Sequence, residues 1–434
     1  MRVSIIGSGY VGTTVAACFA DLGHEVINVD IDQDIVETIN AGNAPIHEDG
    51  LPERIAKHAG PDGTGRLEAT TEYDAVLDTD VTFLCLPTPQ TEDGSIDLSI
   101  MSTAAKQLGA TLADKDSHHT VIVKSTVVPG STEEAITPIL EAASGTTAGE
   151  GLGVGMNPEF LREGTAVDDF LHPDKVVLGA DDDRARQVMQ DVFEPLIAAA
   201  DAPVVETDTR TAEMIKYANN GFLAAKISLI NHIGNICKAV GVDAYEVADA
   251  IALDGRIGDR FLRSGVGWGG SCFPKDTAAI RAAAREHGYE PAMLEAATMV
   301  NDGQPERLLA LMDHHVDVTG KRVAVLGLAF KPGTDDIRNS RAIPVIEGLQ
   351  TRGAEIVAYD PVAGANMRER FPDIEYTDTP AAALDEAAAA LVVTDWAEIT
   401  ALDAEFDAMR TPVVVDGRRA IDRRDGLVYE GLTW

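Results

Sequence analysis

Short apolar runs alternate with longer amphipathic stretches over much of the chain, and most of the runs end in glycine, proline or polar residues. Continuous apolar runs of four to eight residues predict strands that are buried on both faces of a parallel sheet. In the N-terminal half these runs lie at 2–6, 26–29, 81–86 and 120–123, with a helical stretch at 13–20. The glycine- and threonine-rich residues 144–155 are expected to form an exposed connection. The pattern predicts a doubly wound α/β domain over residues 1–200.

The pattern changes at about residue 209, where a long stretch without proline begins. Residues 209–240 predict one continuous helix that is apolar on more than one face, and such a helix is expected to be buried between domains or subunits. Lys216 and Asn220 are four residues apart on it, so they share one side of the helix. We expect a central helical domain over residues 201–305.

A second alternating region follows, with apolar runs at 321–326, 355–359, 388–393 and 412–415. These runs predict a second α/β sheet in residues 306–434 that echoes the first. The turn after its first run, residues 327–331, lacks the glycine spacing of the first domain and contains Lys331. We expect this turn to hold a phosphate by charge, and therefore to bind a different nucleotide.

Charge and cysteine content narrow the class of protein. The 434 residues include 71 acids against 35 lysines and arginines, a formal net charge of −36 spread over the whole chain. This balance is typical of a solvated acidic surface in a salt-loving host and argues against nucleic acid as a partner. The four cysteines are far apart, which favours a reducing compartment and no metal site. No segment has the length or flanks of a membrane span or signal peptide, so we expect a cytoplasmic protein without membrane contact.

The first turn of the chain carries a dinucleotide-binding pattern. Gly7, Gly9 and Gly12 follow an apolar run, a helical stretch comes next, and the second run ends in Asp30. The glycines permit a tight turn, close approach of a pyrophosphate and close packing of helix and strand, while the acid suits a ribose hydroxyl. The order of these features predicts NAD, and the charge of Asp30 disfavours NADP. Thr88 and Thr126 follow later strands and are expected to face the cofactor, with ordinary loop positions as the alternative.

The glycine-rich loop 264–276 is the best candidate for the chemical step. It presents Cys272 with Lys275 and Asp276 three and four residues later. A free cysteine is often a small packing residue. A cation and a carboxylate so close by instead favour a nucleophilic thiol.

These motifs, at 7–12, 124–126, 157–164, 216–220, 267–276 and 327–331, resemble in order and over the full length those of the UDP-glucose/GDP-mannose dehydrogenases. The resemblance implies two Rossmann-like doubly wound sheets, the N-terminal one binding NAD and the C-terminal one UDP, joined by a central long-helix domain. It implies oxidation of a sugar C6 alcohol to a carboxylate with two NAD⁺, the nucleotide-sugar lying between the two α/β domains. The end of the cysteine loop suits the UDP-glucose branch, and Trp268 replaces a more usual phenylalanine.

The resemblance also implies roles for individual residues. Cys272 would attack the aldehyde to form a thiohemiacetal and then a thioester, and Arg256 would reach the site of a neighbouring subunit in a homodimer or higher oligomer. The other catalytic residues would be Lys216 and Asn220 on the C6 oxygen, Glu159 as a base, and Asp276 with Thr126 for water or protons. The cofactor would contact Gly7, Gly9, Tyr10, Val11, Gly12, Asp30, Thr88, Thr126, Glu163 and Lys275. The sugar nucleotide would contact Glu159, Phe160, Leu161, Lys216, Asn220, Arg256, Gly269, Phe330, Lys331 and Arg418. No metal is implied. Glu159 and Glu163 would share a face if their segment were helical.

Three other functions remain open. A GDP-mannose or other nucleotide-sugar 6-dehydrogenase would share the fold and mechanism. A two-electron hydroxy-acid dehydrogenase also pairs a Rossmann unit with a long helix and a lysine/asparagine pair, but it needs neither the thiol nor the second sheet. An NAD-binding regulator without activity would have no need of the catalytic set.

Overall fold

The computed structural model describes all 434 residues, and the chain divides into two compact units, Met1–Asn219 and Asn220–Trp434. The first unit contains one eight-stranded sheet in the order β3-β2-β1-β4-β5-β6-β7-β8. Every pairing is parallel except that between β6 and β7. The strands are β1 (Arg2–Ile6), β2 (Glu25–Val29), β3 (Leu67–Thr70), β4 (Val81–Leu84), β5 (His119–Val123), β6 (Leu152–Met156), β7 (Val176–Ala180) and β8 (Val204–Thr207).

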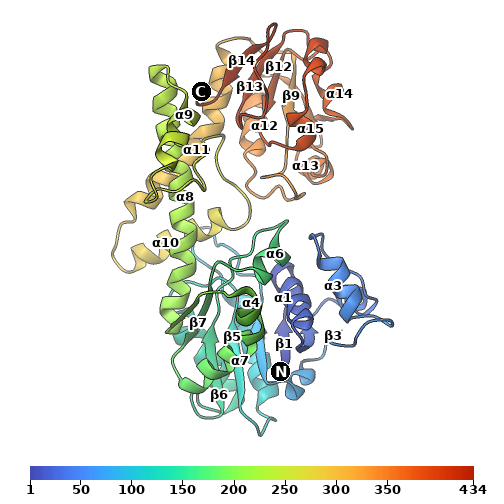
Figure 1. The fold of residues 1–434 in the computed structure, drawn as a ribbon, viewed down its shortest axis with the longest axis vertical. Coiled ribbons are helices and arrows are strands. Elements are labelled where there is room, and N and C mark those ends of the chain that lie inside the picture. Colours follow the sequence, from blue (N-terminus) through green and yellow to red (C-terminus); the bar gives the residue numbers. More distant parts are fainter. The chain divides into compact units, whose positions relative to one another are not determined.

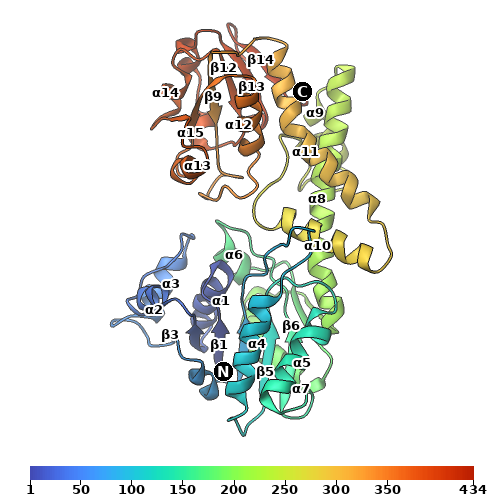
Figure 2. The ribbon, with the colours of Figure 1, turned by 180° about the vertical axis from the view of Figure 1, so that it is seen from behind.

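Helices cover both faces of this sheet, which confirms the predicted doubly wound domain. One face packs against α1, α6 and α7, and the other against α4 and α5 (Figure 1, Figure 2). The hydrophobic core between the sheet and helices α1, α6 and α7 contains an aromatic cluster of Phe19, Phe83, Phe170 and Phe193. The helices are α1 (Tyr10–Asp21), α2 (Gln33–Asn40), α3 (Leu51–His58), α4 (Ser99–Leu112), α5 (Thr137–Ser144), α6 (Ala166–Leu171) and α7 (Asp183–Ala200), with a π-helical turn at Thr132–Ile136.

One local prediction for this unit is wrong, and one condition that the sequence left open is not met. Residues 144–155 are not all exposed, because β6 is fully buried in the middle of the sheet. Its glycines serve packing: a Cβ added to Gly155 would lie 2.5 Å from Met189 Sδ, and one on Gly153 would lie 2.8 Å from Thr120 Oγ1. Residues 157–164 are not helical, so Glu159 and Glu163 do not share a helix face.

The long helix α8 (Thr209–Val240) has the predicted bounds, and the division between the two units falls within it. In the single chain one side of α8 is exposed, so its burial between domains or subunits stays a prediction. Phe222, Leu229 and Ile236 recur every seven residues on α8 and are 71%, 57% and 50% exposed.

The second unit contains a six-stranded parallel sheet in the order β11-β10-β9-β12-β13-β14. This order repeats that of β3-β2-β1-β4-β5-β6, so the predicted echo is confirmed. The strands are β9 (Arg322–Leu326), β10 (Glu355–Tyr359), β11 (Glu375–Tyr376), β12 (Ala389–Val392), β13 (Val413–Asp416) and β14 (Val428–Gly431). The helices are α9 (Ala244–Ala252), α10 (Phe273–Glu286), α11 (Ala292–Asp313), α12 (Ala342–Thr351), α13 (Gly364–Arg370), α14 (Pro380–Leu384) and α15 (Ala397–Thr400).

Candidate active site

The glycine turn after β1 leaves room for a ligand at the N-terminus of α1. Gly7 has φ +101°, and a Cβ on Gly12 would lie 1.9 Å from Gly7 O, so neither position accepts a side chain. Gly9 is the N-cap residue of α1, and no atom lies within 4 Å of a Cβ placed there. The backbone N–H groups of a helix N-terminus attract phosphate. The open space beside Gly9 therefore fits the pyrophosphate of a dinucleotide.

Asp30 lies directly beside this turn. Its carboxylate accepts hydrogen bonds from the backbone N–H groups of Ser8, at 2.5 Å, and Asp32, at 3.0 Å. The partly exposed carboxylate ends β2 at the carboxyl edge of the sheet, where a ribose is bound in this kind of fold.

The predicted threonines meet at the ends of β4 and β5. Thr88 Oγ1 donates to the backbone carbonyl of Thr126 at 2.9 Å, and both residues are buried. Ser125 joins the same two strand ends, because its hydroxyl donates to Leu86 O at 2.7 Å. These hydrogen bonds join the ends of β4 and β5 beside the glycine turn, where Gly7 lies against Cys85 and Leu86.

Tyr10 is held by a carboxylate that the sequence analysis missed. The Tyr10 hydroxyl donates to Glu48 Oε2, and Glu48 also accepts from the backbone N–H groups of Gly164, at 2.8 Å, and Ala166, at 2.6 Å. Glu48 is only 2% exposed. It ties α1 to the segment that contains the half-buried Glu163, a candidate cofactor contact.

Glu159 and Lys216 form a buried ion pair. Lys216 Nζ lies 2.9 Å from Glu159 Oε1, and Leu161 N donates to Glu159 Oε2 at 2.7 Å. Burial alone would raise the pKa of Glu159, but the Lys216 ammonium and the Leu161 N–H hold it below its ordinary value. The Phe160 ring lies beside the same cation, with its centroid 5.4 Å from Lys216 Nζ. The structure thus brings together four of the predicted substrate residues in the first unit: Glu159, Phe160, Leu161 and Lys216.

In the second unit, Cys272 is the N-cap residue of α10 and is partly exposed. The N-terminus of a helix favours negative charge, as a thiolate requires. Ser271 Oγ lies 3.6 Å from Cys272 Sγ, and Asp276 N donates to Cys272 O at 2.8 Å.

Asp276 links the cysteine helix to α8. Its buried carboxylate accepts from Lys275 Nζ at 2.6 Å and from Asn220 Nδ2 at 2.7 Å. The predicted residues Cys272, Lys275, Asp276 and Asn220 therefore form one connected group.

Buried amides that the sequence analysis missed hold the backbone of the cysteine loop. Asn231 Oδ1 accepts from Gly265 N at 2.8 Å, and Gln304 Nε2 donates to Gly265 O at 2.8 Å. Asn301 makes two hydrogen bonds to Trp268, accepting from its N–H at 2.7 Å and donating to its carbonyl at 3.1 Å. A buried loop needs such partners for its backbone groups, and here α8 and α11 supply them.

The C-terminal α/β region brings two more predicted residues, Arg418 and Phe330, to this loop, which itself contains the predicted Gly269. Arg418 Nη2 donates to Gly267 O at 3.2 Å. A Cβ on Gly270 would lie 2.8 Å from the Phe330 ring, and one on Gly269 would lie 2.2 Å from Asn339 O. The loop is glycine-rich because other chain segments approach its backbone closely.

The turn after β9 differs from the first glycine turn in an important respect. The backbone N–H groups of Leu328 and Ala329 donate to Asp360 Oδ2 at 2.7 and 2.9 Å. An internal carboxylate therefore occupies the amides that would otherwise cradle a phosphate. The predicted phosphate contact would rest on the side chain of Lys331.

Arg256 is not brought to the other predicted residues of its unit. Its side chain is 88% exposed and pairs with Asp254.

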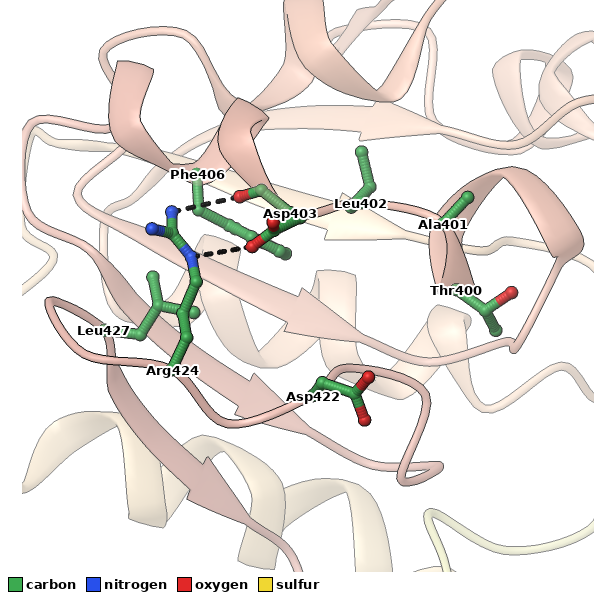
Figure 3. A pocket seen from close by; sticks show the side chains of 8 residues that line it. All are labelled: Thr400, Ala401, Leu402, Asp403, Phe406, Asp422, Arg424 and Leu427. Atoms are coloured by element: carbon green, nitrogen blue, oxygen red, sulfur yellow. Dashed lines mark hydrogen bonds and ion pairs between the residues drawn. The ribbon is translucent and has the colours of Figure 1, made fainter.

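Two surface cavities lie outside the predicted site. One, of about 430 Å³, borders the ends of β10 and β11, and the other, of about 270 Å³, lies between α15 and β14. In the smaller one Arg424 is already paired with Asp403 (Figure 3). No helix is long and apolar enough to cross a membrane, and no cluster of three or more His, Cys, Asp or Glu side chains could hold a metal ion.

Comparison with known proteins gives one consistent result. Three domains of the UDP-glucose/GDP-mannose dehydrogenase family match the chain: the NAD binding domain at residues 1–197, the central domain at 210–303 and the UDP binding domain at 324–423. The chain is 64% identical to the UDP-glucose 6-dehydrogenase AglM of Haloferax volcanii over the whole of both proteins. It is 40% identical to the GDP-mannose 6-dehydrogenase of Pseudomonas aeruginosa, over 84% of each. A UDP-glucose dehydrogenase structure from Pyrobaculum islandicum, 40% identical, superposes with a TM-score of 0.91 and covers 100% of this chain and 98% of that one.

Proposed function

The chain belongs to the UDP-glucose/GDP-mannose dehydrogenase family, and we propose that it oxidises UDP-glucose at C6 to UDP-glucuronate with NAD. The observation that carries the proposal is the start of α10, where the Cys272 thiol lies one helical turn before Asp276, a buried carboxylate that accepts a hydrogen bond from Asn220. Over the full chain the identity to a UDP-glucose enzyme is 64%, against 40% over 84% of the chain to a GDP-mannose enzyme, which favours UDP-glucose as the substrate. We also propose that the domain boundaries lie between residues 200 and 201 and between residues 305 and 306.

The residues fit two successive two-electron oxidations. NAD⁺, when bound, supplies the hydride acceptor for each of them. Lys216 and Asn220 are one helical turn apart on α8, and their donors would hold the C6 oxygen as negative charge develops on it. Glu159, kept ionised by Lys216, is the candidate base for the hydroxyl proton. Thr126 is buried at the strand end next to the cofactor turn, where it can order water.

Cys272 would carry the second half of the reaction. Its sulfur adds to the C6 aldehyde carbon, and the aldehyde oxygen takes a proton, giving a thiohemiacetal. Loss of a second hydride and of the hydroxyl proton gives a thioester. Water then attacks the carbonyl carbon, so that the C–S bond breaks, the carboxylate forms and the thiol is restored. Asp276, buried and bound to Lys275 and Asn220, would orient this water or carry its proton.

The proposal is tested by product mass and by the yield of NADH per sugar. UDP-glucose should give UDP-glucuronate and two NADH with no free aldehyde, and GDP-mannose should be a much poorer substrate. A yield of one NADH per sugar would contradict the four-electron reaction, and no turnover of any nucleotide-sugar would favour a binding protein.

The role of the thiol is tested with Cys272→Ser, and Cys237→Ser, another free cysteine of the second unit, is the matched control. Turnover of Cys272→Ser should fall by at least about a thousandfold, because an oxygen ester forms and hydrolyses far less readily than a thioester. Cys237→Ser should keep wild-type turnover. If Cys272→Ser also does, Cys272 is a packing residue.

We also propose that α8 forms the interface of a homodimer. Phe222, Leu229 and Ile236 form an exposed apolar stripe along α8. In a chain with 71 acids, the only acid of this 32-residue helix is the buried Glu213. A face that is apolar and free of exposed carboxylates suits a second copy of the same acidic chain. The exposed Arg256 would then be available to the neighbouring subunit.

Sedimentation of the protein tests this interface. Leu229→Glu should convert the dimer to a monomer, whereas Ile100→Glu, at an exposed apolar position of α4, should not. A wild-type monomer would contradict the proposal. None of the four cysteines forms a disulfide, which supports a cytoplasmic location.

A further inference from the structure

Lys124 is a buried lysine whose charge is poorly compensated. It follows β5, its side chain is 4% exposed in the folded chain, and its ammonium donates one hydrogen bond, to Asn157 Oδ1 at 2.6 Å. An ammonium carries three donors, and no carboxylate lies within ion-pair distance of this one. Burying a cation in this way is costly, so a purely structural role explains it poorly.

The charged groups around Lys124 belong to the candidate active site. Burial lowers its pKa to about 8, Cys85 and Glu159 oppose this change, and Lys216 adds to it. Cys85 is buried in apolar surroundings that raise its pKa to about 12, so it is a neutral thiol. The remaining buried cluster is Lys124, Glu159 and Lys216, and the half-buried Lys175 lies next to it over the Phe160 ring. With all three ionised, the buried cluster carries one excess positive charge in the interior of the first unit.

We propose that Lys124 is a positioning residue for the oxidation, because its ammonium supplies the excess positive charge that favours an anionic oxygen at Lys216. This inference rests on the proposed function, in which Lys216 holds the C6 oxygen. Until Glu159 takes up the hydroxyl proton, its ion pair with Lys216 is neutral and attracts negative charge on the C6 oxygen only weakly. The second ammonium makes the cluster cationic before the proton moves, which favours negative charge on the C6 oxygen.

Equilibrium binding separates this electrostatic role from a structural one. UDP-glucose is neutral at C6, whereas UDP-glucuronate carries a carboxylate there. Lys124→Met should weaken binding of UDP-glucuronate by about tenfold, the size of one pKa unit of charge interaction, and change binding of UDP-glucose by less than about twofold. Retained UDP-glucose binding also shows that the variant is folded. Equal effects on both ligands would overturn the proposal.

Kinetics give the second readout. Lys124→Met should lower kcat by about tenfold or more with little change in the KM for UDP-glucose. In the wild type, activity should require a protonated group with a pKa near 8, whereas Lys124→Arg should keep activity and lose this alkaline limb. A Lys124→Met enzyme with wild-type kcat or with the limb intact would refute the role of Lys124 while leaving the dehydrogenase function standing. A wild type that does not oxidise UDP-glucose would refute both.

The matched control is Lys115→Met. Lys115 is another lysine of the first unit, partly buried, and its ammonium is bound only to backbone carbonyls that precede β4, at the opposite edge of the sheet from Lys124. This variant should lose some stability but keep the wild-type ratio of the two ligand affinities and the wild-type pH profile. If Lys115→Met shifts the ratio as Lys124→Met does, the effect is not specific to the site.

Discussion

Glu213 in the first turns of α8 is a buried carboxyl group whose ionisation should control the stability of the first unit. It is 0% exposed and accepts hydrogen bonds from the backbone N–H groups of Gly130, at 2.5 Å, and Thr132, at 2.8 Å. These residues lead into the π-helical turn after β5, so Glu213 attaches the loop that follows Thr126 to the helix that carries Lys216.

The pH dependence follows from the sign of its pKa change. Burial raises the pKa of Glu213 to about 7 from an ordinary value of 4.5, although the two N–H donors and Arg210 oppose it. Between pH 4.5 and pH 7 the Glu213 carboxyl keeps its proton in the folded chain but has released it in the unfolded chain. The contribution of Glu213 to the free energy of unfolding is therefore complete below pH 4.5 and is lost as the pH rises to about 7. At about 1.4 kcal/mol per pKa unit, the loss is about 3 kcal/mol.

The test is Glu213→Gln, which is neutral at every pH. Its amide cannot accept both N–H groups, so it carries a constant cost, but its stability relative to wild type should improve by about 3 kcal/mol between pH 4.5 and pH 8. For a unit of this size the difference in Tm should change by roughly 6–12 °C, measured by thermal melting in molar KCl. A difference in Tm that is the same at both pH values would refute the reasoning.

Three further predictions concern the cofactor turn and the surface. Gly9→Ala should fold normally but bind NAD⁺ poorly by calorimetry, since its methyl group enters the open space proposed for the pyrophosphate. Gly12→Ala should also lower the Tm, because its Cβ meets Gly7 O. Equal NAD⁺ affinity of Gly9→Ala and wild type would show that the pyrophosphate lies elsewhere. The ratio of kcat/KM for NAD⁺ over NADP⁺ should be large in wild type and fall in Asp30→Asn, and comparable values in wild type would contradict the ribose assignment. The net charge of −36 predicts that the Tm rises between dilute buffer and molar KCl, and a flat or falling Tm would remove the argument for a salt-adapted surface.

The sequence by itself determined the features that depend on neighbouring residues. The spacing of Gly7, Gly9 and Gly12 encodes a turn whose geometry the structure reproduces, and α8 begins and ends where its composition changes. The apolar runs predicted the central parallel strands of each sheet, β1, β2, β4 and β5 in the first and β9, β10, β12 and β13 in the second, because strands buried on both faces need continuous apolar sequence. The sequence also placed Lys275 and Asp276 near Cys272, since all three lie within five residues at the start of α10.

Only the tertiary structure decided which distant polar groups meet. Glu48 and Tyr10, Asn301 and Trp268, and Lys124 and Asn157 are each 33 or more residues apart, and nothing in their local sequence marks them as pairs. The glycines of β6 misled the pattern analysis, because a glycine that admits a neighbouring side chain and one that relaxes a loop look alike in sequence. A buried polar side chain takes its function from the partners that the fold places beside it, whereas a turn or a helix is largely defined by its own residues.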